Sequence, residues 1–483
     1  MSLSTAFSIA QSSLLSSGRQ TSVLSRNIQE SGNSDYARRI AVNASLAPGV
    51  RTILVQRATN EQLFRQNLSA LADWGGQSAI SAGLEQLEQT VFGVDNSASA
   101  ATAIGKLQEA LQTYSASPAN LSLAENTINA ARQVVTALNS GTAAIQALRV
   151  DTDQQIAEAV DSLNALLQQF KVANDAVVSG VRAGRDVNDA LDMRDALLKK
   201  IAEYVPVTTL SRADGDLALM TRDGAMLFDK IPREVTFRPS SAYAPGVAGN
   251  SVYVDGIPIG LTGDGKAVSG RLAGLVQLRD GVANTMQRQL DEIARGLIAA
   301  FRETGTAVPD APGLFTWAGA PARPAGGTLV DGLAGSIRIN AAFDSSLGGN
   351  PQLLRDGGAN GAAYVANPAG ASGYAELLIA YGDRLDAPMA FDPAAGLGTS
   401  MAVTAFSTTA IGWFEGVRQD ATATLETKEA LSARIAEALS NETGVNIDSE
   451  MSLLLELENS YQATSRLLKA VDDMMAALLA AVG

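Results

Sequence analysis

Hydrophobic positions at both ends of the chain recur alternately every four and three residues. This heptad spacing places them along one face of a helix and is typical of a seam that packs against a partner helix. The N-terminal seam comprises Leu3, Phe7, Ala10, Leu14, Ser17, Thr21, Leu24 and Ile28, and the C-terminal seam comprises Leu454, Leu457, Tyr461, Thr464, Leu468, Val471, Met475, Leu478 and Val482. Neither segment has enough apolar area to be a stable helix alone in water. The periodicity leaves open whether the two helices close one domain or become ordered only when many copies assemble.

The interior of the chain shows helical periodicity from residue 60 to residue 204. Glycine, proline and short polar residues interrupt helices. Breaks are therefore predicted at Gly75-Gly76, Asn96-Ser97, Ser117-Pro118 and Gly180. Further helices are predicted over about 270–302, 400–440 and 448–482.

Residues 206–262 alternate between apolar and polar positions and contain Asp-Gly turns, as β-hairpins do. Residues 303–399 are rich in Gly, Ala and Pro and hold only short apolar pieces such as 336–339. The order of these segments predicts a mainly α fold with a β-rich insert. We expect a long helical rod built from both chain ends, with terminal coiled-coil helices and outer inserted domains.

We expect three domains, each assembled from separate segments of the chain. They are a terminal coiled-coil domain (1–40 with 445–483), a helical rod domain (41–205 with 268–304 and 400–444) and an outer β-rich and loop-rich inserted domain (206–267 with 305–399).

Composition argues against several kinds of chemistry. The chain has 36 basic and 50 acidic residues, a net charge of −14, which argues against nucleic-acid binding. It contains neither Cys nor His, so disulfides, Cys- or His-dependent catalysis and Cys- or His-based metal sites are excluded. We therefore expect no catalytic residues, no cofactor and no metal. Aromatic residues make up only 5%, which favours thin Ala-faced helices over a thick core with large aromatic anchors.

The sequence also bears on membranes and export. No apolar run approaches the roughly 18 residues that a membrane-spanning helix needs. The first charged residue is Arg19, so the basic region of a cleaved secretory signal is not recognisable. We expect no membrane insertion, and either a cytoplasmic protein or one exported without a cleaved signal.

Two features resemble functional sites incompletely. Residues 260–267 (GLTGDGKA) approach a phosphate-binding P-loop, but Ala267 stands where a hydroxyl must hold magnesium, so a turn is the preferred interpretation. The acidic residues on predicted helices, including Asp192, Asp195, 456–458 and 472–473, are interpreted as solvent-exposed faces. Pairs there contribute only a few tenths of a kcal/mol.

Both ends of the chain resemble bacterial flagellar axial proteins. Residues 25–38 are similar to a signature that runs Asn-Asn-Ile-Ala-Asn and then Thr-Pro-Gly-Tyr-Ser-Arg, although Arg26 and Ser34-Asp35 depart from it. Residues 444–450, followed by 461–463 and 471–474, resemble the C-terminal signature of the same family. The positions that carry these motifs are Asn27, Tyr36, Arg38, Gly444, Asn446, Asp448 and Glu450. Two internal segments, 187–195 and 269–280, are similar to segments of the first hook–filament junction protein.

The resemblance implies a structural protein of the bacterial flagellum that sits at the distal end of the hook and allows the filament to assemble. It implies export in an unfolded state through the flagellar type III channel and an extracellular location. The implied partners are further copies of the chain in a ring, the hook protein, a second junction protein and an export chaperone. The terminal helices would pair as a coiled coil.

Alternative functions remain open at this stage. Within the family, a flagellin-like filament protein or a hook-associated protein of the third type is possible, although the two internal segments favour the first junction protein. From a different class, a hydrolase that uses carboxylates could reside in residues 206–399.

Overall fold

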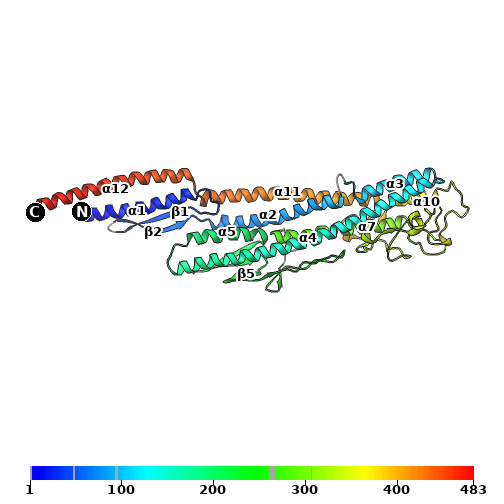
Figure 1. Cartoon of the computed structure of the whole chain (residues 1–483), viewed down its shortest axis with the longest axis horizontal. Coiled ribbons are helices and arrows are strands. Elements are labelled where there is room, and N and C mark those ends of the chain that lie inside the picture. The colour runs from blue at the N-terminus through cyan, green and yellow to red at the C-terminus, as the bar shows by residue number, and fades with distance from the viewer. Residues whose placement is uncertain (1–2, 47–48, 93–95, 260–267, 306, 483) are drawn as a thin grey trace.

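The computed structural model describes residues 3–46, 49–92, 96–259, 268–305 and 307–482. The molecule is elongated, its long helices run lengthwise, and both chain ends lie at the same tip (Figure 1). The P-loop-like segment 260–267 lies outside the described residues.

The predicted terminal helices are confirmed. Helix α1 (Leu3–Gln29) and helix α12 (Ile447–Val482) lie side by side and run in opposite directions (Figure 1). Strands β1 (Arg39–Leu46) and β2 (Gly49–Arg57) form an antiparallel hairpin that also packs against α1. This hairpin was not predicted, although the β-branched residues Ile40, Val42, Ile53 and Val55, which flank the Pro-Gly pair at 48–49, were a usable signal.

Four helices between residues 61 and 204 confirm the predicted helical interior. They are α2 (Glu61–Leu87), α3 (Ala100–Ala116), the 62-residue α4 (Leu121–Arg182) and α5 (Asn188–Tyr204). The first three begin where a side-chain oxygen of Asn60, Ser99 or Asn120 accepts a hydrogen bond from a backbone N–H of the first turn. Helix α2 ends in a π-helical turn, η1 (Glu88–Phe92). The long α11 (Val403–Thr443) returns alongside α2 (Figure 1).

The break predicted at Gly75-Gly76 is wrong, because α2 passes through both glycines without interruption. Their role is close packing. A Cβ at Gly75 would lie 2.5 Å from the carbonyl oxygen of Glu203, and a Cβ at Gly274 would lie 2.2 Å from the carbonyl oxygen of Gly76. The glycines therefore let backbones approach at a helix crossing. Gly180 likewise lies within α4, near its end, whereas the breaks at 96–97 and 117–118 are confirmed.

The predicted β insert is also confirmed. Four antiparallel strands lie in sheet order: β3 (Val207–Ser211), β4 (Leu217–Thr221), β5 (Met226–Asp229) and β6 (Ile231–Pro232). A three-stranded sheet follows: β7 (Val235–Thr236), β8 (Tyr253–Val254) and β9 (Ile257–Pro258). The glycines of the Asp-Gly turns, Gly215, Gly224 and Gly256, have φ of +82°, +88° and +77°, as such turns require.

The helix predicted over 270–302 is continuous but changes its winding. It comprises α6 (Arg271–Val276), a π-helical segment η3 (Gln277–Val282) and α7 (Ala283–Ala300). The loose segment that follows contains only short elements: β10 (Phe315–Thr316), α8 (Leu333–Ser336), β11 (Arg338–Ile339), η4 (Ala341–Phe343), η5 (Ser345–Leu347), α9 (Leu353–Asp356), η6 (Ala362–Tyr364), α10 (Glu376–Asp386), β12 (Met389–Ala390), η7 (Pro393–Ala395) and β13 (Ser400–Met401).

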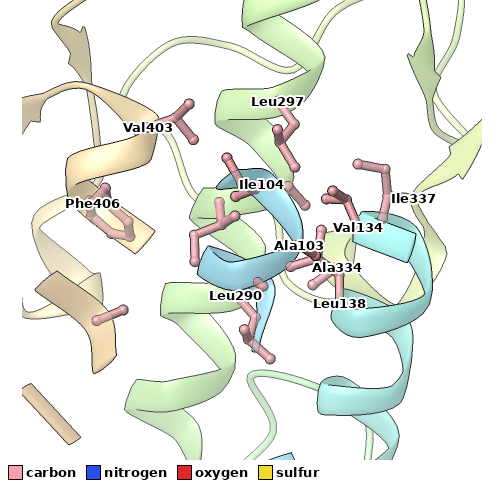
Figure 2. Packing of buried hydrophobic residues seen from close by; sticks show 14 of the residues in the cluster. Ala103, Ile104, Val134, Leu138, Leu290, Leu297, Ala334, Ile337, Val403 and Phe406 are labelled. Carbon is pink, nitrogen blue, oxygen red and sulfur yellow. The ribbon is translucent and has the colours of Figure 1, made fainter. Parts of the chain in front are cut away.

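The loose segment and the β insert contribute to different hydrophobic cores. The first core gathers side chains of α3, the first half of α4, α7, the loose segment and α11, several of which meet in Figure 2. It contains the stacked pairs Phe391–Phe406 and Phe301–Tyr381, so aromatic anchors do gather here, contrary to the expectation of a core with few of them. The second core joins the later half of α4, α5, α6 and the β insert.

Candidate functional site

The helices that carry the two predicted seams, α1 and α12, pack against each other. In α1, Ala10 and Ser17 are buried, Thr21 is exposed, and the remaining seam residues are half-buried. In α12, Val471 is buried, while Leu454, Leu457, Thr464, Leu468 and Met475 are half-buried. Tyr461 and Leu478 differ from the expectation, since they are 49% and 56% exposed. The side chain of Val482 lies outside the described residues.

A buried polar cluster joins the two chain ends at the base of this pair. Asn27, on the last turns of α1, and Glu450, on the first turn of α12, are 0% and 2% exposed. The amide nitrogen of Asn27 donates to Glu450 Oε2 and to the carbonyl oxygen of Arg39, both at 2.9 Å. Its amide oxygen accepts from the Tyr36 hydroxyl at 2.8 Å and from the Arg39 backbone N–H at 2.9 Å. The amide therefore uses its full capacity of four hydrogen bonds.

The other motif residues lie near this cluster, around the turn between α11 and α12 and at the start of the hairpin. The N–H of Arg38 donates to the carbonyl oxygen of Thr443 at 2.7 Å. Gly444 ends α11, and the Asn446 side chain accepts from the N–H of Ser449 at 3.0 Å at the start of α12. Asp448 is exposed in the first turn of α12. The residues that resemble the axial-protein signatures thus define the corner where α1, the hairpin, α11 and α12 meet.

An ion network attaches the base of the hairpin to α5. Arg39 and Arg57 lie directly opposite each other on β1 and β2, an arrangement that is unfavourable without counter-charges. Asp192 supplies one, at 2.6 Å from Arg39 and 3.1 Å from Arg57. Asp189 binds Arg39 at 2.9 Å and Asp195 binds Arg57 at 2.6 Å.

This network corrects the interpretation of Asp192 and Asp195 as residues of a solvent-exposed helix face. Asp192 is only 9% exposed, because it faces two arginines that are distant in sequence. Arg26 of α1 also binds Asp189 at 2.7 Å, and this hydrogen bond is the main reason that the pKa of Asp189 is lowered. The guanidinium of Arg39 further lies 4.6 Å from the ring of Tyr36. For Glu456, Glu458, Asp472 and Asp473 the exposed positions are confirmed.

A second ion cluster involves the internal segment 269–280. Arg279, in the π-helical segment, binds the fully buried Asp153 of α4 and its neighbour Asp280, each at 2.6 Å. Arg149 of α4 donates to backbone carbonyls of residues 244, 247 and 279 and stacks on Tyr243. The cluster ties the loop before β8 to two helices. Both internal segments that resemble junction proteins, 187–195 and 269–280, are therefore points where distant elements are joined by buried charges.

The partners in these clusters were not foreseen from the sequence. Asp189, Asp192 and Asp195 recur every three residues on α5, which indicates one face. Two of the arginines that they bind, Arg39 and Arg57, come from an unpredicted hairpin, and the third, Arg26, comes from α1. Within the described part of the chain, no group of three or more acidic residues is arranged to hold a metal ion. No described helix is long and apolar enough to cross a membrane.

Two protein-family models match the chain, in ranges that include parts of these clusters. The model for the flagellar hook-associated protein FlgK helical domain matches residues 84–308, a range that contains both internal segments. The model for the flagellar basal body rod FlgEFG protein C-terminal region matches residues 439–481, which contain Gly444 to Glu450. A search of curated protein sequences found no match.

Among solved structures, the chain is similar to the flagellar hook junction protein FlgK from Burkholderia pseudomallei, with 19% sequence identity and a TM-score of 0.43. The match covers 52% of this chain and 46% of that chain, so it spans less than half of the solved protein. FlgK and FlgEFG proteins are structural components of flagella. The two family models match one chain in this order, so its middle is similar to the FlgK helical domain and its C-terminal region is similar to FlgEFG proteins.

Proposed function

We propose that the chain is a structural subunit of the bacterial flagellum that assembles at the distal end of the hook, forms the hook–filament junction and allows the filament to assemble. The observation that carries this proposal is the FlgK helical-domain match over residues 84–308, combined with the axial-protein match at the C-terminus. The two matched regions contain the cluster around Arg279 and Asp153, and they contribute Asp192 and Glu450 to the other two buried clusters.

Self-association is supported by the apolar side chains that the terminal helices leave uncovered. In α12 these are Ile447, Met451, Leu453, Leu455, Leu467, Met474, Leu478 and Leu479. A thin helix pair that exposes so many large apolar residues is typical of a surface that other subunits cover. A ring of copies, bordered by the hook protein on one side and a second junction protein on the other, would cover them.

Export by the flagellar type III route, assisted by a chaperone, and an extracellular location complete the proposal. A chain that travels unfolded must refold at its destination, and disulfides would impede passage. The absence of cysteine from the sequence is compatible with this route. The domain division proposed above assigns residues 1–40 and 445–483 to the assembling end.

Deletion of the gene tests the junction role. We expect cells with bare hooks under the electron microscope and flagellin shed into the medium as soluble monomer, with filaments restored by the full chain. Filaments of normal length on the deletion strain would refute the junction assignment.

Substitutions in the seam test how assembly occurs. Leu24→Asp or Leu468→Asp places a charge in the α1–α12 pair and should abolish assembly on hook tips, because an unpaired carboxylate is costly in an apolar contact. Thr408→Asp, on an exposed turn of α11, is the matched control and should assemble normally. Normal assembly of both seam variants would show that the terminal pair is not required.

A further inference from the structure

We propose that Asn27 and Glu450 set the axial register of α1 against α12 and so act as a stop for the sliding of α1. The register itself is argued from contacts in the single chain. The register also sets how far α1 extends along the axis of the subunit. That this length matters at the junction rests on the proposed function.

The hydrogen bond between Asn27 and Glu450 defines the observed register. The helices are antiparallel, so moving away from this bond means moving toward the start of α1 and toward the end of α12. Alternating steps of four and three residues in these directions place seam residues of one helix opposite seam residues of the other. The pairs that follow are Leu24 with Leu454, Thr21 with Leu457, Ser17 with Tyr461, Leu14 with Thr464, Ala10 with Leu468, Phe7 with Val471 and Leu3 with Met475. The burial of Ala10 and Val471 agrees with this alignment.

The apolar seam alone does not select this register. Helix α12 continues its seam beyond the start of α1, and Leu478 is left 56% exposed. An outward movement of α1 by one heptad, about 10 Å along the helix axis, keeps every seam position of α1 opposite a seam position of α12 and leaves only Leu454 of the α12 seam without a seam partner. The pairs then become Phe7 with Leu478, Ala10 with Met475, Leu14 with Val471, Ser17 with Leu468, Thr21 with Thr464, Leu24 with Tyr461 and Ile28 with Leu457.

The shifted register buries more apolar surface in two places. Leu478 gains the aromatic partner Phe7, and Leu14 lies opposite Val471 instead of Thr464. The movement lengthens the distance between the end of α1 and the hairpin by about 10 Å. Residues 30–38 can span this distance, because nine extended residues reach up to about 30 Å. The movement is opposed by the packing of the hairpin against α1 and by the polar contacts of α1, and the most buried of these polar contacts are those of Asn27.

Asn27 provides that opposition because it binds three separate elements. Its four hydrogen bonds reach Glu450 on α12, Tyr36 in the connecting segment and both backbone groups of Arg39 on β1. After a one-heptad movement, the amide of Asn27 would face the region of Leu457, and Glu450 would lose its donor. Buried polar groups without partners are costly, so the observed register is favoured although it leaves apolar surface exposed. Two other contacts of α1 are weaker: Arg26–Asp189 is exposed, and Ser16–Asn43 is 3.4 Å long.

Disulfide trapping in the purified full chain distinguishes the two registers. The chain has no cysteine, so each introduced pair is the sole possible cross-link within one molecule, and monomeric product is separated from cross-linked dimer by size. The Ala10→Cys/Leu468→Cys pair reports the observed register, and the Ala10→Cys/Met475→Cys pair reports the shifted one. Each pair is placed in the otherwise unchanged chain, in the Asn27→Leu/Glu450→Leu background, and in the control background Ser25→Leu/Glu456→Leu. The control adds the same two apolar side chains at exposed positions of the same helices.

We expect the 10–468 cross-link to predominate in the unchanged and control backgrounds, and the 10–475 cross-link to predominate in the Asn27→Leu/Glu450→Leu background. Two results would overturn the inference. If 10–468 still predominates there, the seam selects the register without the polar pair. If both cross-links are lost, the pair holds the helices together rather than aligning them. Because the readout uses isolated protein, failure here is separate from failure of the junction role, which the gene deletion tests.

Discussion

Buried charged residues connect segments that are far apart in sequence. Asp192 accepts hydrogen bonds from Arg39 and Arg57, which are more than 130 positions earlier. The side chain of Arg39 is 2% exposed, so it depends on its carboxylate partners to offset the loss of hydration. The ion pairs of Arg39 and Arg57 therefore determine how firmly the hairpin is held on the rod.

Asp192→Asn should lower the free energy of unfolding by about 3 kcal/mol, because it leaves buried guanidinium charge without its closest partner. Urea denaturation measures the loss, and faster hydrogen exchange in residues 39–57 locates it. The control is Asp175→Asn, which removes an exposed pair with Lys171 and should cost less than about 0.5 kcal/mol. Equal effects of both substitutions would contradict the importance of burial.

Asp291 gives the molecule a dependence on pH. Its carboxylate is fully buried and accepts hydrogen bonds from Gln287 and from the backbone N–H groups of Gly332 and Ala334. Burial raises its pKa from 3.8 to about 6, while these hydrogen bonds oppose the rise. Because the folded-state pKa exceeds the unfolded-state value, the folded state binds this proton more tightly. The contribution of Asp291 to stability therefore increases as the pH falls from above 6 toward 4.

Asp291→Asn should remove that increase. The difference between 3.8 and about 6 corresponds to about 3 kcal/mol at most, so the stability of the unchanged chain relative to the variant should rise by up to that amount between pH 7 and pH 4. Urea denaturation at several pH values measures it. Asp383→Asn, at an exposed position of α10, should leave the pH dependence unchanged. A constant difference between the unchanged chain and the Asp291 variant at all pH values would refute the assignment.

At the scale of elements, the crossing of α2 with the ends of α5 and α6 depends on the absence of side chains. Gly75 approaches the backbone of Glu203, and Gly76 approaches Gly274, at distances that no Cβ tolerates. These contacts involve backbone atoms, which cannot rotate away. The glycines that looked like helix breaks therefore set the spacing between helices of the second core.

Gly75→Ala should destabilise the chain by roughly 1–3 kcal/mol, because the new Cβ would overlap the Glu203 carbonyl oxygen. Gly105→Ala is the matched control in α3, where nothing lies within 4 Å of the new methyl group. It should stabilise the chain by about 0.5–1 kcal/mol through higher helix propensity. Thermal or urea denaturation measures both, and a stabilising Gly75→Ala would contradict the packing explanation.

At the scale of the whole molecule, the terminal pair is separate from the two hydrophobic cores. Both cores are built from residues between positions 64 and 421 and draw nothing from α1 or α12. The terminal helices also expose many apolar side chains, whereas α7 is almost wholly buried. The central rod should therefore fold without the assembling end.

A chain that ends at Asn446 should keep the unfolding midpoint of the full chain within a few degrees, because no core side chain is removed. Differential scanning calorimetry measures this midpoint. The unchanged full chain serves as the reference, and Phe414→Ala, which opens a cavity in the first core, should lower the midpoint clearly. A large decrease on truncation alone would show that the terminal pair supports the rod.

The sequence by itself determined most of the elements of this protein and their order. Heptad spacing located α1 and α12, Asp-Gly turns located the β insert, and motif residues at both ends pointed to the family, because these signals are local in the chain. Tertiary structure decided which elements meet. Gly75 and Gly76 allow close helix packing instead of breaking a helix. Asp192 is buried because it binds Arg39 and Arg57 of the hairpin, and Asn27 meets Glu450, which is 423 positions later in the chain. Such contacts depend on how distant segments pack, and periodicity in one segment carries no information about its partner.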